Sequence, residues 1–285
     1  MIRKGSKGKD MATMMEATGS SAKGTNRPGH ASLGVPDDQL DPGYKQLTGS
    51  RQFGEHDELD PEFKDYLTRM LSIQARIELE YMYFPERTLC RPLAMAPHPE
   101  DRVEYAAFWA EEVRHASYWI KILDGLGVKT DMAFLSTPLP IYLFEMRDEA
   151  EDWVEYAYFS FFGDRQGAYM GFEWVNNPYE PLAKIAERVW REEIGHAAFG
   201  YTLLRRICQT AEGRKKAEHF LTKWYPAGLD MFGSDRSKRQ HDFIRWGLRK
   251  RTNKQMRDAF ILEVNDLLNK LQLPIPDPLA GRRYV

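Results

Sequence analysis

Two copies of a Glu-x-x-His motif, each inside a long stretch with the apolar period of a helix, restrict most strongly what this chain can fold into. Glu112 and His115 form the first copy, and Glu193 and His196 form the second. Side chains three residues apart lie on one face of a helix, so each pair reaches a common point from one side. Apolar residues flank both pairs, and buried charges are costly unless they are paired or bind a metal. The motifs therefore predict helices that meet around a metal site in the core, and not two solvated helix faces.

An acidic residue between the two motifs, Asp164, is a candidate ligand from a further helix. Residues 176–178 (Asn-Asn-Pro) interrupt the helical pattern about midway between Asp164 and Glu193. Both acids therefore lie roughly twelve residues from the same turn, and they meet at one depth when the two helices fold back on each other. This arrangement is typical of half of a carboxylate-bridged dimetal site.

The remaining carboxylate comes from the first predicted helix, which begins at Asp60-Pro61 with an N-cap and a proline in the first turn. Leu71 and Glu78 continue one apolar stripe of this helix. Glu80 lies two residues further on and cannot share that face, so Glu78 is the favoured ligand and Glu80 the alternative. The four carboxylates are also the catalytic candidates. The predicted metal ligands are Glu78, Glu112, His115, Asp164, Glu193 and His196. Such a set without a thiolate suits two iron ions, with manganese as the alternative.

The apolar period predicts an all-α protein, a ferritin-like four-helix bundle with additional C-terminal helices. The bundle helices are expected near residues 60–85, 99–125, 144–175 and 179–210, and further helices near residues 213–229, 236–249 and 253–270. A loop with several prolines is expected between the first two helices. Residues 59–285 are predicted to form the ferritin-like domain. Residues 1–58 are rich in Gly, Ser and Lys without an apolar period, so a disordered or extended tail is expected there.

Composition excludes several classes of function. The net charge of −2 over 285 residues gives no general attraction to nucleic acid or to an anionic membrane. No segment has the uninterrupted apolar length that would span a bilayer, and the N-terminus lacks the apolar run of a secretory signal. Two isolated cysteines, Cys90 and Cys208, indicate neither a disulfide framework nor a zinc ribbon. A soluble, cytoplasmic protein is expected.

The segment GDRQGAYMGFEWVNNPYEPLAKIAERVWREEIGH, which contains Asp164, Glu193 and His196, resembles the second ligand pair of the phenylacetate-catabolism di-iron oxygenases. The catalytic subunit of phenylacetyl-CoA epoxidase typifies that family. LTRMLSIQARIE resembles its first ligand helix, and WYPAGLDMFG, RTNKQMRDAF and LPIPDP follow in the family's order. The chain departs from the epoxidase pattern in a longer loop after Glu78, in Phe108 where the pattern has lysine, and in ending soon after LPIPDP.

The resemblance implies an enzyme that uses O2 to hydroxylate or epoxidise a small organic substrate of an aromatic or acyl-CoA type. Electrons would come from a separate reductase, because the sequence shows neither a dinucleotide-binding motif nor a cysteine set for an iron–sulfur cluster. The basic run Arg245–Lys254, where few buried contacts are expected, is a candidate docking surface for that reductase, with a solvated helix end as the alternative. A homo-oligomer or a complex with a related bundle subunit is also expected. The alternatives are a ferroxidase or iron-binding ferritin-like protein, and a non-catalytic scaffold subunit of a multicomponent oxygenase.

Two further groups of residues are predicted to surround the metal ions. The candidates for an apolar wall are Phe108, Trp109, Phe161, Phe162 and Tyr169. The candidates for orienting the ligands are Glu111, Glu192 and Arg165, with surface ion pairs as the alternative for each.

Overall fold

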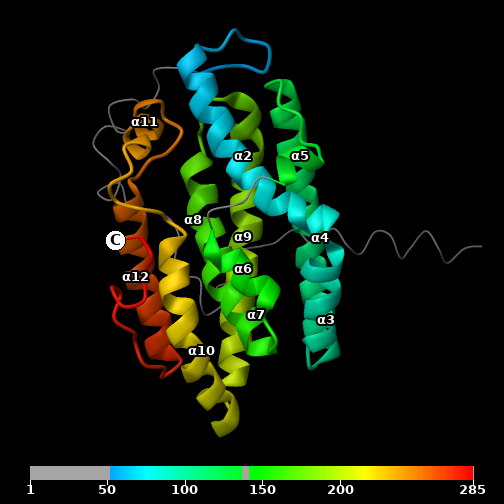
Figure 1. The fold of residues 1–285 in the computed structure, drawn as a ribbon, viewed down its shortest axis with the longest axis vertical. Coiled ribbons are helices and arrows are strands. Elements are labelled where there is room, and N and C mark those ends of the chain that lie inside the picture. Colours follow the sequence, from blue (N-terminus) through cyan, green and yellow to red (C-terminus); the bar gives the residue numbers. More distant parts are fainter. Residues whose placement is uncertain (1–51, 137–140, 285) are drawn as a thin grey trace, which may run out of the picture.

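Helices account for nearly all of the regular structure in the computed structural model, which describes residues 52–136 and 141–284 (Figure 1). Within these ranges there is no strand, only an isolated bridge between Phe53 and Tyr179. The prediction of an all-α protein is therefore confirmed. A tail was predicted over residues 1–58, and residues 1–51 of it lie outside the described residues. No helix in the described ranges is long and apolar enough to cross a membrane.

Four helical segments form the bundle, and they lie side by side in Figure 1. They are α2 (Pro61–Tyr83), α4 (Pro99–Gly125), a segment made of α7 (Trp153–Phe159), η3 (Ser160–Asp164) and α8 (Arg165–Trp174), and α9 (Glu180–Ile207). Helix α2 packs on α4, the composite segment packs along α9, and α4 meets α9 across the core. The predicted four-helix bundle is thus confirmed, and α2 begins where expected, since the Asp60 side chain accepts hydrogen bonds from the N–H groups of Glu62 and Phe63.

The third bundle helix is not continuous, contrary to the prediction of one helix over residues 144–175. Helix α6 (Tyr142–Glu149) ends at Ala150, whose ψ of 134° is extended, and α7 begins after Asp152, which caps the N–H of Val154. A π-turn, η3, then separates α7 from α8 and carries Asp164 at its end. A π-turn adds one residue to the helical repeat, which changes the direction of Asp164, and such turns occur often at functional sites.

The proline-containing segment between α2 and α4 is helical, so the prediction of a loop there is wrong. It consists of the π-turn η2 (Glu86–Cys90) and the short helix α3 (Arg91–Met95). Pro92 lies in the first turn of α3, a position at which proline is tolerated. The prolines of this segment therefore interrupt the apolar pattern of the sequence, but the backbone from Glu86 to Met95 remains helical.

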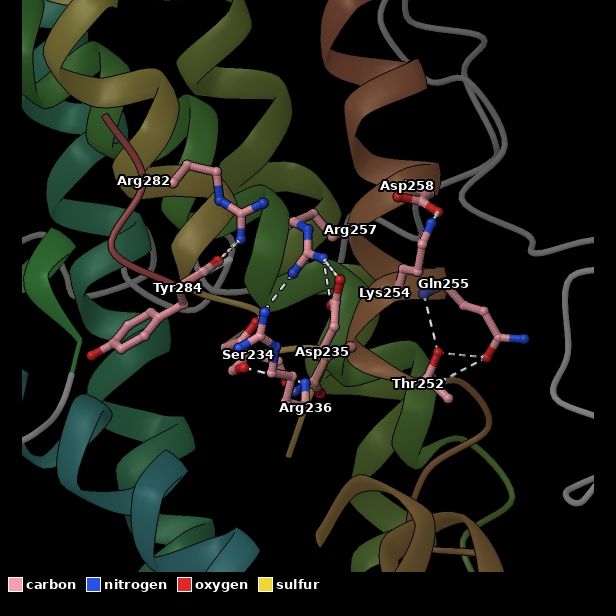
Figure 2. Close-up of polar contacts among 12 residues, drawn as sticks. Ser234, Asp235, Arg236, Thr252, Lys254, Gln255, Arg257, Asp258, Arg282 and Tyr284 are labelled. Carbon is pink, nitrogen blue, oxygen red and sulfur yellow. Dashed lines mark hydrogen bonds and ion pairs between the residues drawn. The ribbon is translucent and has the colours of Figure 1, made fainter. Parts of the chain in front are cut away.

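The predicted C-terminal helices are present as α10 (Ala211–Asp230), α11 (Arg239–Arg245) and α12 (Asn253–Lys270), with α11 shorter than expected. Helix α10 packs on α7 and on α12. Figure 2 shows how polar contacts hold this part together: Arg257 of α12 binds the carboxylate of Asp235, and Thr252 and Gln255 form a capping box at the start of α12. A short helix, α5 (Met132–Leu135), packs against α2.

Two cations of the basic run Arg245–Lys254 lie in the core, so the prediction that few buried contacts involve this run is wrong. Lys250 and Arg251 are buried. The Lys250 ammonium donates to the carbonyl oxygens of Phe172, Glu173 and Val175 at the end of α8. The Glu173 carboxylate accepts from Arg251 Nε (2.7 Å) and from the backbone N–H groups of both basic residues. These positive charges fix a loop to α8, and they are not available to a reductase.

Gly200 is the position on which the contact between α9 and the π-turn depends. A Cβ atom there would lie 2.3 Å from the backbone N of Phe161 and 2.6 Å from the carbonyl C of Ser160. We expect Gly200→Ala to lower the free energy of unfolding by about 1–3 kcal/mol, because the backbone has to move apart. Gly195→Ala on the same helix meets no atom within 4 Å, so it should raise stability by about 0.5–1 kcal/mol. Equal melting temperatures for the two variants would contradict this packing.

The buried pair of Arg251 and Glu173 provides a second test. Both side chains have no solvent exposure, so Arg251→Ala leaves a buried carboxylate without its partner. We expect a loss of about 3–5 kcal/mol in the free energy of unfolding, measured by chemical denaturation. Lys184→Ala removes an exposed ion pair with Glu180 and should change the midpoint little. If Arg251→Ala leaves the free energy of unfolding unchanged, Arg251 becomes a candidate for the docking surface again.

Candidate metal centre

Three helices bring a group of potential metal ligands together in the core. Ligand atoms of Glu78 on α2, Glu112 and His115 on α4, and Glu193 on α9 all lie within 4.8 Å of one another. All four side chains are buried, and His115 has no exposed surface. Glu78 therefore points into the core, as the apolar stripe of its helix predicted.

Glu112 and Glu193 each face both histidines. One Glu112 oxygen lies 3.7 Å from Nδ1 of His115 and the other lies 2.9 Å from Nδ1 of His196. One Glu193 oxygen lies 3.6 Å from Nδ1 of His115 and the other lies 3.8 Å from Nδ1 of His196. Two carboxylates thus stand between two imidazoles, with one oxygen directed to each side.

Asp164 and Glu78 adjoin this pair near different histidines. Glu78 lies 4.0 Å from Nδ1 of His115. Asp164 lines a small space together with Glu112 and His196, and it lines a second space together with Glu78. All six residues of the predicted ligand set are therefore gathered in one place. One further carboxylate lies on the side of each imidazole, and Glu112 and Glu193 face both imidazoles.

The acidic residue that precedes each Glu-x-x-His motif binds the histidine of the other motif. Glu192 on α9 lies 2.8 Å from Nε2 of His115, and Glu111 on α4 lies 2.9 Å from Nε2 of His196. Each imidazole is thus held at its outer nitrogen by a carboxylate, and its inner nitrogen faces the cluster. Hydrogen bonds of this kind fix the orientation of a metal-ligating histidine.

Arg165 does not orient a ligand, so that prediction is wrong. Its guanidinium is buried, and it donates to the carboxylate of Glu263 on α12 and to the carbonyl oxygen of Ala197. The residue following Asp164 therefore ties the π-turn to α12 and α9. No pattern in the sequence links this arginine to residue 263.

Glu78 and Glu80 occupy two different electrostatic environments. Glu78 accepts hydrogen bonds from the side chains of Gln74 and Trp119. Glu80 accepts a hydrogen bond from Arg147 Nη2 (2.7 Å) and lies 3.3 Å from Arg87. Only Glu78 of the two belongs to the cluster of potential ligands. Residues Trp119 and Arg147 were not predicted to take part.

Burial and mutual attraction shift the pKa values in opposite directions. Burial raises the pKa of Glu78 and of Asp164 well above their usual range. Burial opposes protonation of His115 and His196, but hydrogen bonds to carboxylates outweigh it and raise the pKa of both imidazoles. For Glu112, burial acts against ionisation, but the close contact with His196 and the positive charges of the two histidines lower its pKa to about 2. Protons thus compensate the excess negative charge of the cluster.

The donor set fits a pair of divalent cations. His115 Nδ1 is buried and has no hydrogen-bond partner among the described residues, although three carboxylates surround it at 3.6 to 4.0 Å. These separations are longer than hydrogen bonds, and the nitrogen points at the centre of the group. A buried polar atom without a partner is costly, and a metal ion would pair it. Metal ions also replace the protons that the ligands otherwise hold.

Two small spaces adjoin the cluster. One, of about 30 Å³, is lined by all four carboxylates of the set but by neither histidine, together with Tyr81, Phe144 and Phe159. The other, of about 10 Å³, lies near His196 and is lined by Phe108 and Trp109. About 10–15 Å³ is enough for one water-sized molecule. The larger space therefore lies on the carboxylate side of the cluster, and the smaller one reaches His196.

The aromatic wall was predicted only in part. Phe108 and Trp109 line the smaller space, as expected. Phe161, Phe162 and Tyr169 do not line either space. The rings of Phe162 and Tyr169 pack on the C-terminal helices instead, against Tyr225 and Phe260. The sequence missed Phe144 and Phe159, since the broken third helix turns a different face toward the cluster than a continuous helix would. It also missed Tyr81 of α2.

Gly167 is a further residue of the site that the sequence did not single out. A Cβ atom at this position would lie 2.6 Å from Oε2 of Glu193. The absence of a side chain on α8 therefore makes room for a carboxylate that faces both histidines.

Comparison with known proteins identifies the relatives of the chain. Residues 52–283 match the protein family described as phenylacetic acid catabolic protein. One subunit of the 1,2-phenylacetyl-CoA epoxidase of Escherichia coli (strain K12) is 27% identical over 104 residues. That match covers 35% of this chain and 33% of the relative, so it spans about a third of each protein.

The two acidic residues of α2 permit a matched test of the ligand set. We expect Glu78→Ala to reduce the iron bound per chain, because it removes a carboxylate from the cluster. Glu80→Ala should retain the iron but lower the melting temperature, because buried Arg147 loses a partner. Elemental analysis after anaerobic iron loading and thermal unfolding measure the two effects. Loss of iron in Glu80→Ala alone would transfer the ligand role to Glu80.

Proposed function

The chain belongs to the phenylacetic acid catabolic protein family, and from this premise we propose that it is a non-haem di-iron oxygenase. The proposed reaction hydroxylates or epoxidises a small organic substrate of an aromatic or acyl-CoA type. The observation that carries the proposal is the pair of buried carboxylates, Glu112 and Glu193, which both face His115 and His196. Such an arrangement is typical of carboxylate-bridged dimetal sites in helical bundles.

The residues are assigned by the side of the cluster on which they lie. Glu78 and His115 would hold one iron ion, Asp164 and His196 the other, and Glu112 and Glu193 both. When bound, two iron ions would supply the reductive activation of O2 and the transfer of one oxygen atom to the substrate, with manganese as the alternative metal. Oxygen and nitrogen donors without a thiolate support this choice of metal.

The protein's own contribution is to orient the ligands and to exclude water. Glu111 and Glu192 hold the outer nitrogens of the histidines, which leaves both Nδ1 atoms directed inward. The rings of Tyr81, Phe108 and Phe159 border the spaces beside the carboxylates. An apolar border keeps bulk water from reacting with an activated oxygen species.

Electrons are proposed to come from a separate reductase, because the sequence has neither a dinucleotide-binding motif nor a cysteine set for a cluster. In the basic run Arg245–Lys254, the burial of Lys250 and Arg251 leaves only Arg245, Arg249 and Lys254 as candidates for a docking surface. The named relative is one subunit of an epoxidase. This supports a complex of our chain with a related bundle subunit, and a homo-oligomer is the alternative.

Two other functions compete with the oxygenase. A ferroxidase or iron-binding protein would use the same cluster, but it would not need an aromatic border on the carboxylate side. A non-catalytic scaffold subunit would not need the ligands, and all six are present and directed at one another. The crossed pairs of Glu111 and Glu192 with the histidines also favour a working metal site.

The proposal is tested with isotopically labelled O2. We expect the iron-loaded protein, given a reductant and candidate aromatic acids or their CoA thioesters, to yield a product that contains one labelled oxygen atom, detected by mass spectrometry. His196→Ala keeps helix propensity but removes a nitrogen donor, so iron content and product should both fall by at least about tenfold. Iron oxidation without a labelled organic product, across the substrates offered, would favour the ferroxidase. A wild-type protein that takes up no iron would favour the scaffold.

A further inference from the structure

Both oxygen atoms of Glu78 accept a hydrogen bond from a neutral side chain. The Gln74 amide donates to Oε1 (2.5 Å) from one turn earlier on α2, and the Trp119 indole N–H donates to Oε2 from α4. Glu78 is 1% exposed, so bulk water does not compete for these oxygens. We propose that Gln74 and Trp119 are positioning residues, which hold the Glu78 carboxylate in the orientation in which it binds a metal ion.

The two donors fix the carboxylate from two helices. Trp119 is buried, and its ring packs edge-on against Trp174 at the end of α8, with ring centroids 5.4 Å apart. The oxygen that Trp119 binds, Oε2, is the one that faces Nδ1 of His115 at 4.0 Å. A carboxylate oxygen has two lone pairs, so it can accept one N–H and still bind a metal ion. The hydrogen bonds therefore restrict the rotation of Glu78 and leave it able to act as a ligand.

The neutrality of both donors distinguishes Glu78 from the acids outside the ligand set. Glu80 is bound by Arg147 (2.7 Å) and Glu192 by Arg114 (3.1 Å), whereas Glu78 has no ion pair with lysine or arginine among the described residues. A cation on Glu78 would compete with a metal ion for the same carboxylate. The four carboxylates of the ligand set, when ionised, are balanced by two divalent cations. Neutral donors thus fix Glu78 without neutralising the charge that a metal ion needs.

A second glutamine beside the cluster provides a matched comparison. Gln166 on α8 lines the same space of about 30 Å³ as Gln74, and both side chains are half-buried. Among the described residues, Gln74 donates to a carboxylate of the ligand set and Gln166 does not. The loss of a polar group near the metal ligands should therefore affect both positions alike, whereas the loss of a hydrogen bond to Glu78 affects only Gln74.

The binding of Co(II) to the metal-free full chain, without O2 or reductant, tests the positioning role. That Glu78 binds a metal ion rests on the proposed function, and Co(II) is the probe because its visible absorption depends on the geometry of its ligands. We expect Gln74→Leu and Trp119→Phe each to weaken Co(II) binding about tenfold and to change this absorption, since hydrogen bonds to metal ligands contribute at this level. Gln166→Leu is the control and should change neither.

A double variant shows whether Gln74 acts through Glu78. In Glu78→Ala the acceptor of the hydrogen bond is absent, so the addition of Gln74→Leu should not weaken Co(II) binding further. Gln74→Lys tests the neutrality of the donor. It should weaken Co(II) binding more than Gln74→Leu does, because the ammonium would pair with the Glu78 carboxylate. Thermal unfolding of each metal-free variant establishes that it is folded.

Three results would overturn the positioning role. They are unchanged Co(II) affinity and absorption in Gln74→Leu, an equal loss of affinity in Gln166→Leu, and a further tenfold loss when Gln74→Leu is added to Glu78→Ala. If Trp119→Phe does not fold, the half-buried Gln74 decides the matter alone. The expected Co(II) results without an oxygenated product would count against the proposed function and leave the positioning role intact. An oxygenated product with unchanged Co(II) binding in the variants would do the reverse.

Discussion

The burial of four carboxylates and two histidines at the meeting point of four helical segments is the constraint on which the rest of the structure depends. Charges without water or partners are costly, so the helices are stable in this arrangement only if every carboxylate meets a proton, an imidazole or a cation. The shifted pKa values indicate that protons and imidazoles compensate the carboxylates when no cation is bound. They do not satisfy the whole cluster, because Nδ1 of His115 has no hydrogen-bond partner among the described residues.

The need to place the ligands to within a fraction of a helical turn explains the backbone irregularities nearby. The π-turn η3 redirects Asp164, and Gly200 permits the backbone of that turn to approach α9 more closely than any side chain would allow. Gly167 makes the corresponding space for Glu193. These three features lie close to the proposed ligands, and together they exchange local helix stability for the position of the carboxylates.

The apolar periodicity of the sequence could predict those features of the structure that depend on which face of a helix a side chain occupies. It indicated the all-α fold, the start of α2 at Asp60 and the direction of Glu78. It could not show the π-turn, because an insertion of one residue leaves the apolar stripes on either side intact. Periodicity also failed for Lys250 and Arg251. Their partner Glu173 lies in a distant segment, and the local sequence does not distinguish a buried cation from an exposed one. Contacts between remote residues decide such cases, and a single sequence does not record them.

Helix α2 connects the cluster with the aromatic border through two acids that face different ways. Glu80 holds Arg147, whose guanidinium lies 5.6 Å from the ring centroid of Tyr81, 5.2 Å from that of Phe144 and 5.5 Å from that of Phe159. These three rings border the space on the carboxylate side of the cluster. A guanidinium over aromatic faces is attracted to them, and in a buried setting the attraction reaches about 2 kcal/mol. A displacement of α2 would therefore move a proposed metal ligand and the wall of the adjoining space together. This coupling gives a physical reason why two acids in one turn of α2 serve separate purposes.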